Sequence, residues 1–196
     1  MARLGYNNWE EVYQKEKVED MPWYNEDIDT DLELEIKKRS LKKGRFLDLG
    51  TGPGTQAARM AEIGFDVTGS DISPTAIEKA RKLHGKVSFV VDDILHTKLH
   101  KTFDYIFDRG CFHVLEPEER NPYIQNVKKL LSDKGILFLK CFSTKEINDK
   151  GPHRFSHEDI KKIFSRDFII ESIKDTLYQG RSSMSPKALF CVLKKK

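Results

Sequence analysis

The 196-residue chain lacks long apolar runs and has few cysteines. No segment approaches the ~20 apolar residues of a membrane-spanning helix. Residues 1–11 contain no apolar signal region, and the mean hydropathy is −0.57. The three cysteines, Cys111, Cys141 and Cys191, are an odd number at wide spacing, which argues against a disulfide framework and a zinc site. We therefore expect a cytoplasmic protein with reduced thiols, no metal site and no membrane partner.

Neither sign of charge dominates the composition. The 34 Lys and Arg against 31 Asp and Glu leave a net charge of +3, with the two signs interspersed along most of the chain. This balance is too weak to indicate a nucleic-acid partner. With 38% hydrophobic residues, 12 Gly and 7 Pro, the chain is neither collagen-like nor of low complexity. We expect one globular unit and a monomer.

The apolar pattern changes near residue 44. Before it, helical periodicity is interrupted at Pro22, so residues 1–43 are interpreted as a helical N-terminal cap. Residues 44–196 alternate short apolar runs with helical stretches, which predicts an α/β fold with a parallel sheet covered on both faces. The predicted strands are 45–49, 66–70, 86–91, 103–107, 136–141, 168–174 and 187–193, and the predicted helices are 55–63, 74–83, 117–131 and 157–164. The last two strands have no helix between them, so they should form a hairpin at one edge.

A glycine-rich turn, Asp48-Leu-Gly50-Thr-Gly52-Pro-Gly54-Thr55, joins the first of these strands to a helix. Such a turn lets a nucleotide-like ligand approach the backbone closely. A dinucleotide site prefers G-x-G-x-x-G, but here the third glycine comes one residue early and Thr55 takes its place. Asp48 would repel a pyrophosphate and suit a ligand carrying ammonium and sulfonium charges. A Walker A loop is excluded because no Gly-Lys-Ser/Thr follows.

Acidic residues also end the next two predicted strands. Asp71 follows the second strand, where a carboxylate can accept both hydroxyls of a ribose. Alternatively, it caps the helix that Ser73 begins. Asp92 and Asp93 follow the third strand, and either of them could accept an adenine amino group. Three acidic strand ends suit an adenosine that carries no phosphate.

Together with the strand 103–107, these residues resemble the Rossmann-like class I S-adenosylmethionine-dependent methyltransferases over residues 44–196. The resemblance implies a doubly wound, mostly parallel seven-stranded sheet with an antiparallel last strand. It also implies S-adenosylmethionine as cofactor and S-adenosylhomocysteine as product. The cofactor-binding residues that it implies are Asp48, Gly50, Thr51, Gly52, Gly54, Thr55, Asp71, Ile72, Asp93, Ile94, Asp108 and Trp23. The segment Asp108-Arg-Gly-Cys-Phe-His113 is similar to the corresponding stretch of the thiopurine and tellurite-resistance methyltransferases. The extension with Trp9 and Trp23 resembles the cap of that branch and of the related halide and thiol methyltransferases.

Arg109 and His113 are the candidate substrate-positioning residues. The guanidinium of Arg109 could hold an anionic substrate, or it could pair with Asp108 or with the acidic residues 116–119. For His113 the alternative is a role in the core, since methyl transfer to a thiolate or halide needs no base. Trp23 could cover the sheet edge, or form a lid whose ring makes a cation–π contact with the sulfonium.

The function predicted from this resemblance is methyl transfer to a small nucleophile: a thiol, a halide or a chalcogen anion. Two alternatives remain open: a methyltransferase that acts on protein or RNA, and an NAD-dependent oxidoreductase. A covered cavity of small-molecule size would favour the first function, and an open substrate face would favour a macromolecule.

Overall fold

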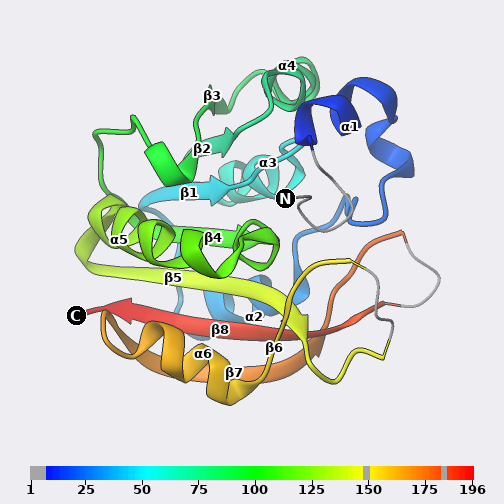
Figure 1. Cartoon of the computed structure of the whole chain (residues 1–196). Helices are drawn as coiled ribbons and strands as arrows, with labels where there is room; N and C mark the ends of the chain where they lie inside the picture. The colour runs from blue at the N-terminus through cyan, green and yellow to red at the C-terminus, as the bar shows by residue number, and fades with distance from the viewer. Residues whose placement is uncertain (1–7, 148–150, 182–184) are drawn as a thin grey trace.

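The computed structural model describes residues 8–147, 151–181 and 185–196, in which one central sheet carries helices on both faces (Figure 1). Its strands are β1 (Arg45–Leu49), β2 (Asp66–Asp71), β3 (Ser88–Val91), β4 (Phe103–Arg109), β5 (Leu131–Ser143), β6 (Arg154–Phe155), β7 (Phe168–Leu177) and β8 (Lys187–Lys195). They are arranged in the order β3-β2-β1-β4-β5-β8-β7, and β6 pairs with the end of β5. Strand β8 runs antiparallel to both of its neighbours, β5 and β7.

The described part of the chain also contains six α-helices and four short 3-10 turns, of which α1, η1 and α2 precede the first strand. The helices are α1 (Trp9–Lys15), α2 (Thr30–Lys38), α3 (Thr55–Ile63), α4 (Pro74–Leu83), α5 (Arg120–Leu130) and α6 (His157–Phe164). The turns are η1 (Val18–Asp20), η2 (Ile94–His96), η3 (Phe112–Val114) and η4 (Pro117–Glu119). None of these helices is long and apolar enough to cross a membrane.

The sheet separates two apolar layers because alternate residues of a strand point to opposite faces. In β1, Phe46 packs with α2, α3 and α4, whereas Leu47 packs with α5 and α6. In β5, Phe138 and Leu139 alternate in the same way. The strands are therefore buried on both faces, which explains their nearly continuous apolar sequences.

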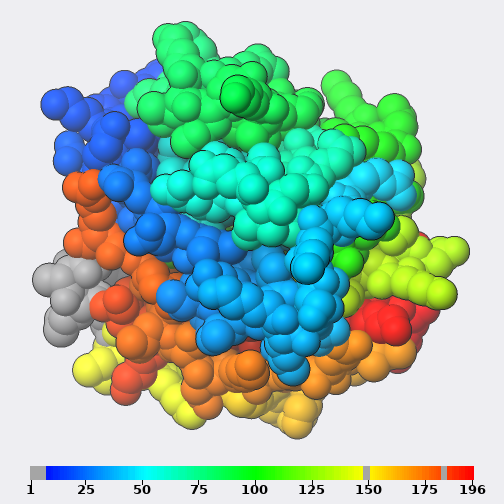
Figure 2. Space-filling model, turned by 180° about the vertical axis from the view of Figure 1, so that it is seen from behind, coloured from blue at the N-terminus to red at the C-terminus, as the bar shows by residue number. Residues whose placement is uncertain are grey.

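The N-terminal segment has two parts with different positions. Helix α2 begins at Asp29, whose carboxylate accepts hydrogen bonds from the amides of Asp31 and Leu32. Leu32 and Ile36 pack into the core, and the blue segment in Figure 2 lies between cyan α3 and orange β7. Helix α1 lies instead beside α4, near the carboxyl ends of the strands (Figure 1).

The predicted α/β fold, with its mostly parallel sheet, antiparallel last strand and terminal hairpin, is confirmed. Helices α3, α4 and α6 have the predicted bounds, and Ser73 caps α4 by accepting the amide hydrogen of Ala76. The single helix predicted over 117–131 is wrong: η4 precedes α5, and Leu131 already pairs with Phe103 in the sheet. The eighth strand, β6, was not predicted, because two residues carry no recognisable periodicity.

Candidate active site

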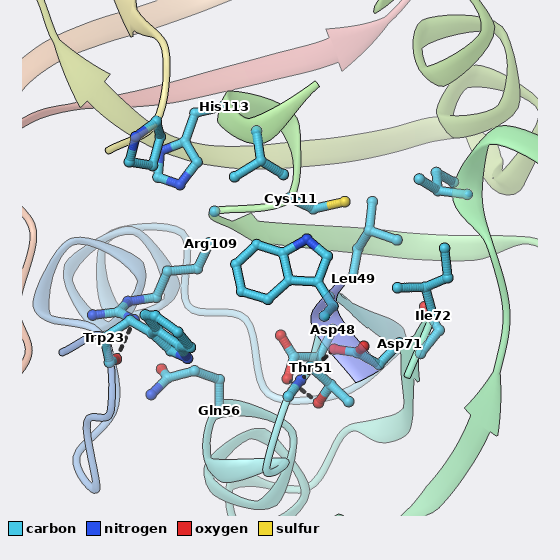
Figure 3. A pocket seen from close by; sticks show the side chains of 18 of the residues that line it. Trp23, Asp48, Leu49, Thr51, Gln56, Asp71, Ile72, Arg109, Cys111 and His113 are labelled. Carbon is cyan, nitrogen blue, oxygen red and sulfur yellow. Dashed lines mark hydrogen bonds between the residues drawn. The ribbon is translucent and has the colours of Figure 1, made fainter. Parts of the chain in front are cut away.

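A cavity of about 600 Å³ opens at the carboxyl ends of β1, β2 and β4. Parallel α/β sheets bind their ligands at this edge. Figure 3 shows Asp48, Thr51 and Asp71 together at one end of the cavity and His113 at the other. The predicted residues that line it are Trp23, Asp48, Gly50, Thr51, Gly52, Thr55, Asp71, Ile72, Asp93, Ile94, Arg109 and His113.

Two glycines of the turn after β1 are required for different physical reasons. Gly52 has a φ of 51° and lies under α1, where a Cβ would come within 2.5 Å of the Tyr13 hydroxyl oxygen. Gly54, at φ 82°, does not line the cavity: a Cβ there would meet the ring of Phe89 at 2.6 Å and Ala80 at 3.1 Å. Gly54 therefore permits close packing of α3 on the sheet, and we do not carry it into the proposed cofactor site.

Asp48 is a buried carboxylate at the end of β1, with 3% of its surface exposed. Its Oδ2 accepts hydrogen bonds from Thr51 Oγ1 at 2.5 Å and from the Ala57 amide at 3.1 Å. Burial raises the pKa of this carboxyl to about 6. A cation in the cavity would stabilise its ionised form.

Asp71 ends β2 and faces the same space. Its Oδ2 accepts the Gly52 amide hydrogen at 2.9 Å, and its Oδ1 accepts that of Ser73 at 2.9 Å. These bonds tie the glycine turn to the start of α4, and they leave acceptor capacity on both oxygens for a ligand. Burial raises the pKa of Asp71 to about 6, despite those amide donors.

The residues after β3 lie at the edge of the cavity. Asp93 caps η2 through the Leu95 amide, and its other oxygen lies 2.9 Å from His96 Nδ1. The oxygens of Asp92 accept hydrogen bonds from Thr97 and Lys98. Both aspartates line the cavity, so the choice between them for an adenine contact stays a prediction.

Asp108 is placed differently from the prediction. It is fully buried and does not line the cavity. Its carboxylate accepts hydrogen bonds from the amides of Gly110, Cys111 and Phe112 and from the Tyr123 hydroxyl. We therefore do not carry Asp108 into the cofactor site: it holds the turn after β4, and the sequence gives no sign that it points inward.

Arg109 connects the N-terminal segment to the sheet. Its Nε lies 3.1 Å from Asp29, its Nη1 donates to the carbonyl oxygen of Trp23 at 3.0 Å, and its Nη2 donates to the carbonyl oxygen of Gln179. The guanidinium also lies 4.4 Å from the ring centre of Tyr178. The ion-pair partner is Asp29 rather than the acidic residues weighed from the sequence. Whether Arg109 also contacts substrate stays a prediction.

His113 forms part of an aromatic group at the other end of the cavity. Its ring centre lies 4.9 Å from that of Phe142 and 5.7 Å from that of Tyr178. Its Nδ1 accepts the amide hydrogen of Phe142 at 3.2 Å. Burial, and then the charge of Arg109, lower the pKa of His113 to about 3, so the imidazole is neutral near pH 7.

Aromatic side chains from the N-terminal segment line the cavity. Trp9 and Trp23 meet edge to face at 5.6 Å, and Tyr13 and Trp23 are joined by a side-chain hydrogen bond. Helix α1 is held in place by Glu10, whose carboxylate accepts hydrogen bonds from the hydroxyls of Ser73 and Thr75. Both predicted tryptophans therefore border the cavity.

Several lining residues were not predicted. They are Tyr13, Gln56, Phe142 and Tyr178, among others. Tyr178 follows an antiparallel strand. The expectation that ligands bind at the carboxyl ends of parallel strands therefore could not identify it. The sequence also did not predict the ion pairs of Asp29 with Arg109 and Lys140, because these partners lie 80 and 111 residues away along the chain.

Comparison with known proteins agrees with this geometry. Residues 46–135 match the family described as a methyltransferase domain. The chain is 31% identical to the probable thiol methyltransferase 2 of Arabidopsis thaliana over 134 residues, which are 65% of this chain and 59% of that protein. It is 32% identical to an uncharacterised methyltransferase of Schizosaccharomyces pombe over 102 residues, which are 50% of this chain and 70% of that protein. The chain thus spans less than two thirds of the length of the plant relative and more than two thirds of the length of the yeast relative.

Solved structures show the same fold. A structure from work on the conversion of a disulfide bond into a thioacetal group during echinomycin biosynthesis superposes with a TM-score of 0.83 at 23% identity, covering 96% of this chain and 91% of that one. The chain belongs to the class I S-adenosylmethionine-dependent methyltransferases, as its resemblance implied, and the cofactor of this family is S-adenosylmethionine.

Proposed function

We propose that this protein transfers the methyl group of S-adenosylmethionine to the sulfur of a small-molecule thiol. The observation that carries the proposal is the division of one cavity into two ends. Buried carboxylates and a glycine turn form one end, and aromatic side chains around His113 form the other. The relative in Arabidopsis thaliana that is described as a probable thiol methyltransferase supports the choice of sulfur.

The acidic end suits the adenosyl and amino-acid parts of the cofactor. Both oxygens of Asp71 retain acceptor capacity for the ribose hydroxyls, and Asp48 supplies negative charge for a cationic ligand. Ile72 and Ile94 provide apolar surface nearby for an adenine ring. When bound, the cofactor supplies an electrophilic methyl group on a sulfonium sulfur.

The aromatic end suits an organic substrate. Phe142, Tyr178, Val114 and Leu115 form its walls, so apolar surface rather than a ring of cations meets the substrate. The chain's task there is to hold the nucleophile in line with the methyl group and to exclude water, and good orientation can supply about 7–11 kcal/mol of the barrier.

The size and lining of the cavity favour this function over the alternatives. Trp9 and Trp23 line the cavity together with residues of the sheet, and its volume of about 600 Å³ is of small-molecule size. The carboxylate of Asp48 beside the glycine turn disfavours the pyrophosphate of NAD. Both observations support a small-molecule methyltransferase.

The cofactor assignment is tested by calorimetry with S-adenosylmethionine, with NAD as the comparison ligand. We expect Asp71→Ala to weaken binding of S-adenosylmethionine by about 100-fold or more, since charge-assisted hydrogen bonds contribute roughly 1.5–3 kcal/mol each. Asp66→Ala, at the exposed opposite end of the same strand, is the control and should leave the affinity unchanged. Unchanged affinity in Asp71→Ala, or tighter binding of NAD, would refute the assignment.

The acceptor is tested by mass spectrometry of products from a panel of thiols, halides, selenite and tellurite. We expect methylated thiols. Binding of the cofactor without methylation of any thiol would overturn the substrate assignment while leaving the cofactor assignment intact.

A further inference from the structure

The hydrogen bond between Phe142 and His113 determines which ring nitrogen of the histidine carries the proton. A backbone N–H can only donate, so the Nδ1 that it meets at 3.2 Å must be an acceptor. The neutral ring therefore carries its hydrogen on Nε2. That nitrogen lies 3.1 Å from where a Cβ of Gly110 would stand, and among the described residues it has no hydrogen-bond partner.

The groups that face His113 keep it neutral. The guanidinium of Arg109 comes from β4, His153 from the segment before β6 and Tyr178 from the segment after β7. The Tyr178 hydroxyl donates to the carbonyl oxygen of Arg109 at 2.7 Å, and burial raises its pKa strongly. With 5% of its surface exposed, His113 faces a positive charge and, within residues 8–147, 151–181 and 185–196, no carboxylate that raises its pKa, so it acts as an N–H donor and not as a base at neutral pH.

The other titratable groups at this end are also poor proton acceptors. Tyr178 uses its hydroxyl hydrogen inside the protein, and Cys111 would have to ionise before it could accept a proton. His153 does not line the cavity, and its Nε2 lies 3.4 Å from Glu116. Asp48 and Asp71 lie at the opposite end, where Figure 3 shows them together. Among the described residues, none is therefore placed to take the proton of a substrate at this end of the cavity.

We propose that the Nε2–H of His113 donates a hydrogen bond to the sulfur of the substrate thiolate, and that the site thereby favours thiols that ionise readily. The proposal rests on the proposed function. The thiol releases its proton to water. Its sulfur then forms a bond to the methyl carbon, while the carbon–sulfonium bond breaks and leaves its electron pair on the departing sulfur. The products are a methyl thioether and S-adenosylhomocysteine, and no protein group changes its protonation.

Two variants of His113 distinguish a role as hydrogen-bond donor from a purely structural role. In His113→Asn the side-chain oxygen can still accept the Phe142 amide hydrogen, but no donor remains at the ε position. In His113→Gln an amide N–H remains there. We expect kcat/KM for thiophenol to fall about 10- to 100-fold in His113→Asn and to recover to within a few-fold in His113→Gln. His157→Asn is the control, because that histidine pairs with Asp175 on the surface.

A binding measurement without turnover tests the same contact. In the complex with S-adenosylhomocysteine, the absorbance of 4-nitrothiophenol reports ionisation of the bound thiol. We expect its pKa to be about one unit lower than in water for the wild type and His157→Asn, and to lose this shift in His113→Asn. An unshifted pKa in the wild type, or an equal shift in His113→Asn, would overturn the role of His113.

The pH dependence of kcat/KM tests the absence of a base. We expect the inflection to follow the thiol, at lower pH for thiophenol than for 2-mercaptoethanol. An inflection at one pH for both thiols would reveal a protein base and refute the proposal, while thiol methylation itself would stand. If no thiol is methylated although the cofactor binds, the proposed function fails instead.

Discussion

At the scale of single residues, two buried aspartates carry the electrostatics of the cofactor end. Asp48 and Asp71 both have pKa values near 6, because burial costs the charged form more than their hydrogen bonds restore. Each is therefore mostly ionised at pH 7 and mostly protonated at pH 5. A cationic cofactor binds the ionised form better, so its affinity is linked to pH.

We expect the affinity for S-adenosylmethionine to weaken as the pH falls through about 6. Protonation of Asp48 and Asp71 removes the negative charge that attracts the cofactor, so binding at pH 5 should be roughly tenfold weaker than at pH 7. Calorimetry across this range measures the effect. His113→Asn should show the same dependence, because His113 stays neutral in this range. Constant affinity from pH 7 to 5 would contradict the assignment of these two carboxylates.

At the scale of elements, α1 is attached to the rest of the molecule through the start of α4. The Glu10 carboxylate accepts hydrogen bonds from Ser73, from the Thr75 hydroxyl and from the Thr75 amide, and these donors lower its pKa to about 2. Lys79 adds hydrogen bonds to the carbonyl oxygens of Tyr13 and Glu16. The position of Tyr13 over the glycine turn therefore depends on a few polar contacts and a small apolar cluster.

We expect Glu10→Ala to loosen α1 without unfolding the sheet. Loss of these charge-assisted hydrogen bonds should speed trypsin cleavage after Lys15 and Lys17 about tenfold and weaken the cofactor affinity by a similar factor. The matched control on the same helix is Glu11→Ala, since the Glu11 side chain is 56% exposed and pairs with its neighbours Lys15 and Asn8 on the same helix turn rather than with α4. Equal cleavage rates in the two variants would show that Glu10 does not hold α1.

At the scale of the whole molecule, a buried charge cluster joins segments far apart in the sequence. Lys140 of β5 is fully buried, and its Nζ lies 2.7 Å from Asp29, 2.7 Å from Asp31 and 2.6 Å from the side chain of Gln179. Asp29 also pairs with Arg109. The cluster thus joins the start of α2 to β4, β5 and the segment after β7, and through Arg109 it reaches the carbonyl oxygen of Trp23.

We expect Lys140→Met to lower the free energy of unfolding by about 3–5 kcal/mol, because it removes the buried cation that pairs with Asp29 and Asp31 and leaves the fully buried Asp29 with Arg109 alone among the described cations. Urea denaturation measures this loss. The control is Lys145→Met, just beyond the same strand, where the ion pair with Asp175 is exposed and should contribute less than about 1 kcal/mol. Similar losses in both variants would mean that burial does not set the contribution of Lys140.

The sequence alone determined the sheet and the acidic end of the cavity. Apolar periodicity located the long strands, the N-cap Ser73 located the start of α4, and the order of Asp48, the glycines and Asp71 identified the strand ends. These features are local, because alternation, capping and turn geometry depend on residues close together in the chain.

Only the tertiary structure decided which charges meet and which side chains reach the cavity. In the tertiary structure, Asp108 accepts hydrogen bonds from the turn after β4, and Gly54 packs against Phe89. The tertiary structure also places Lys140, within an apolar strand, beside aspartates more than 100 residues away. The physical reason is that a buried ion pair or aromatic contact is selected by packing in three dimensions, and spacing along the chain contains no record of it.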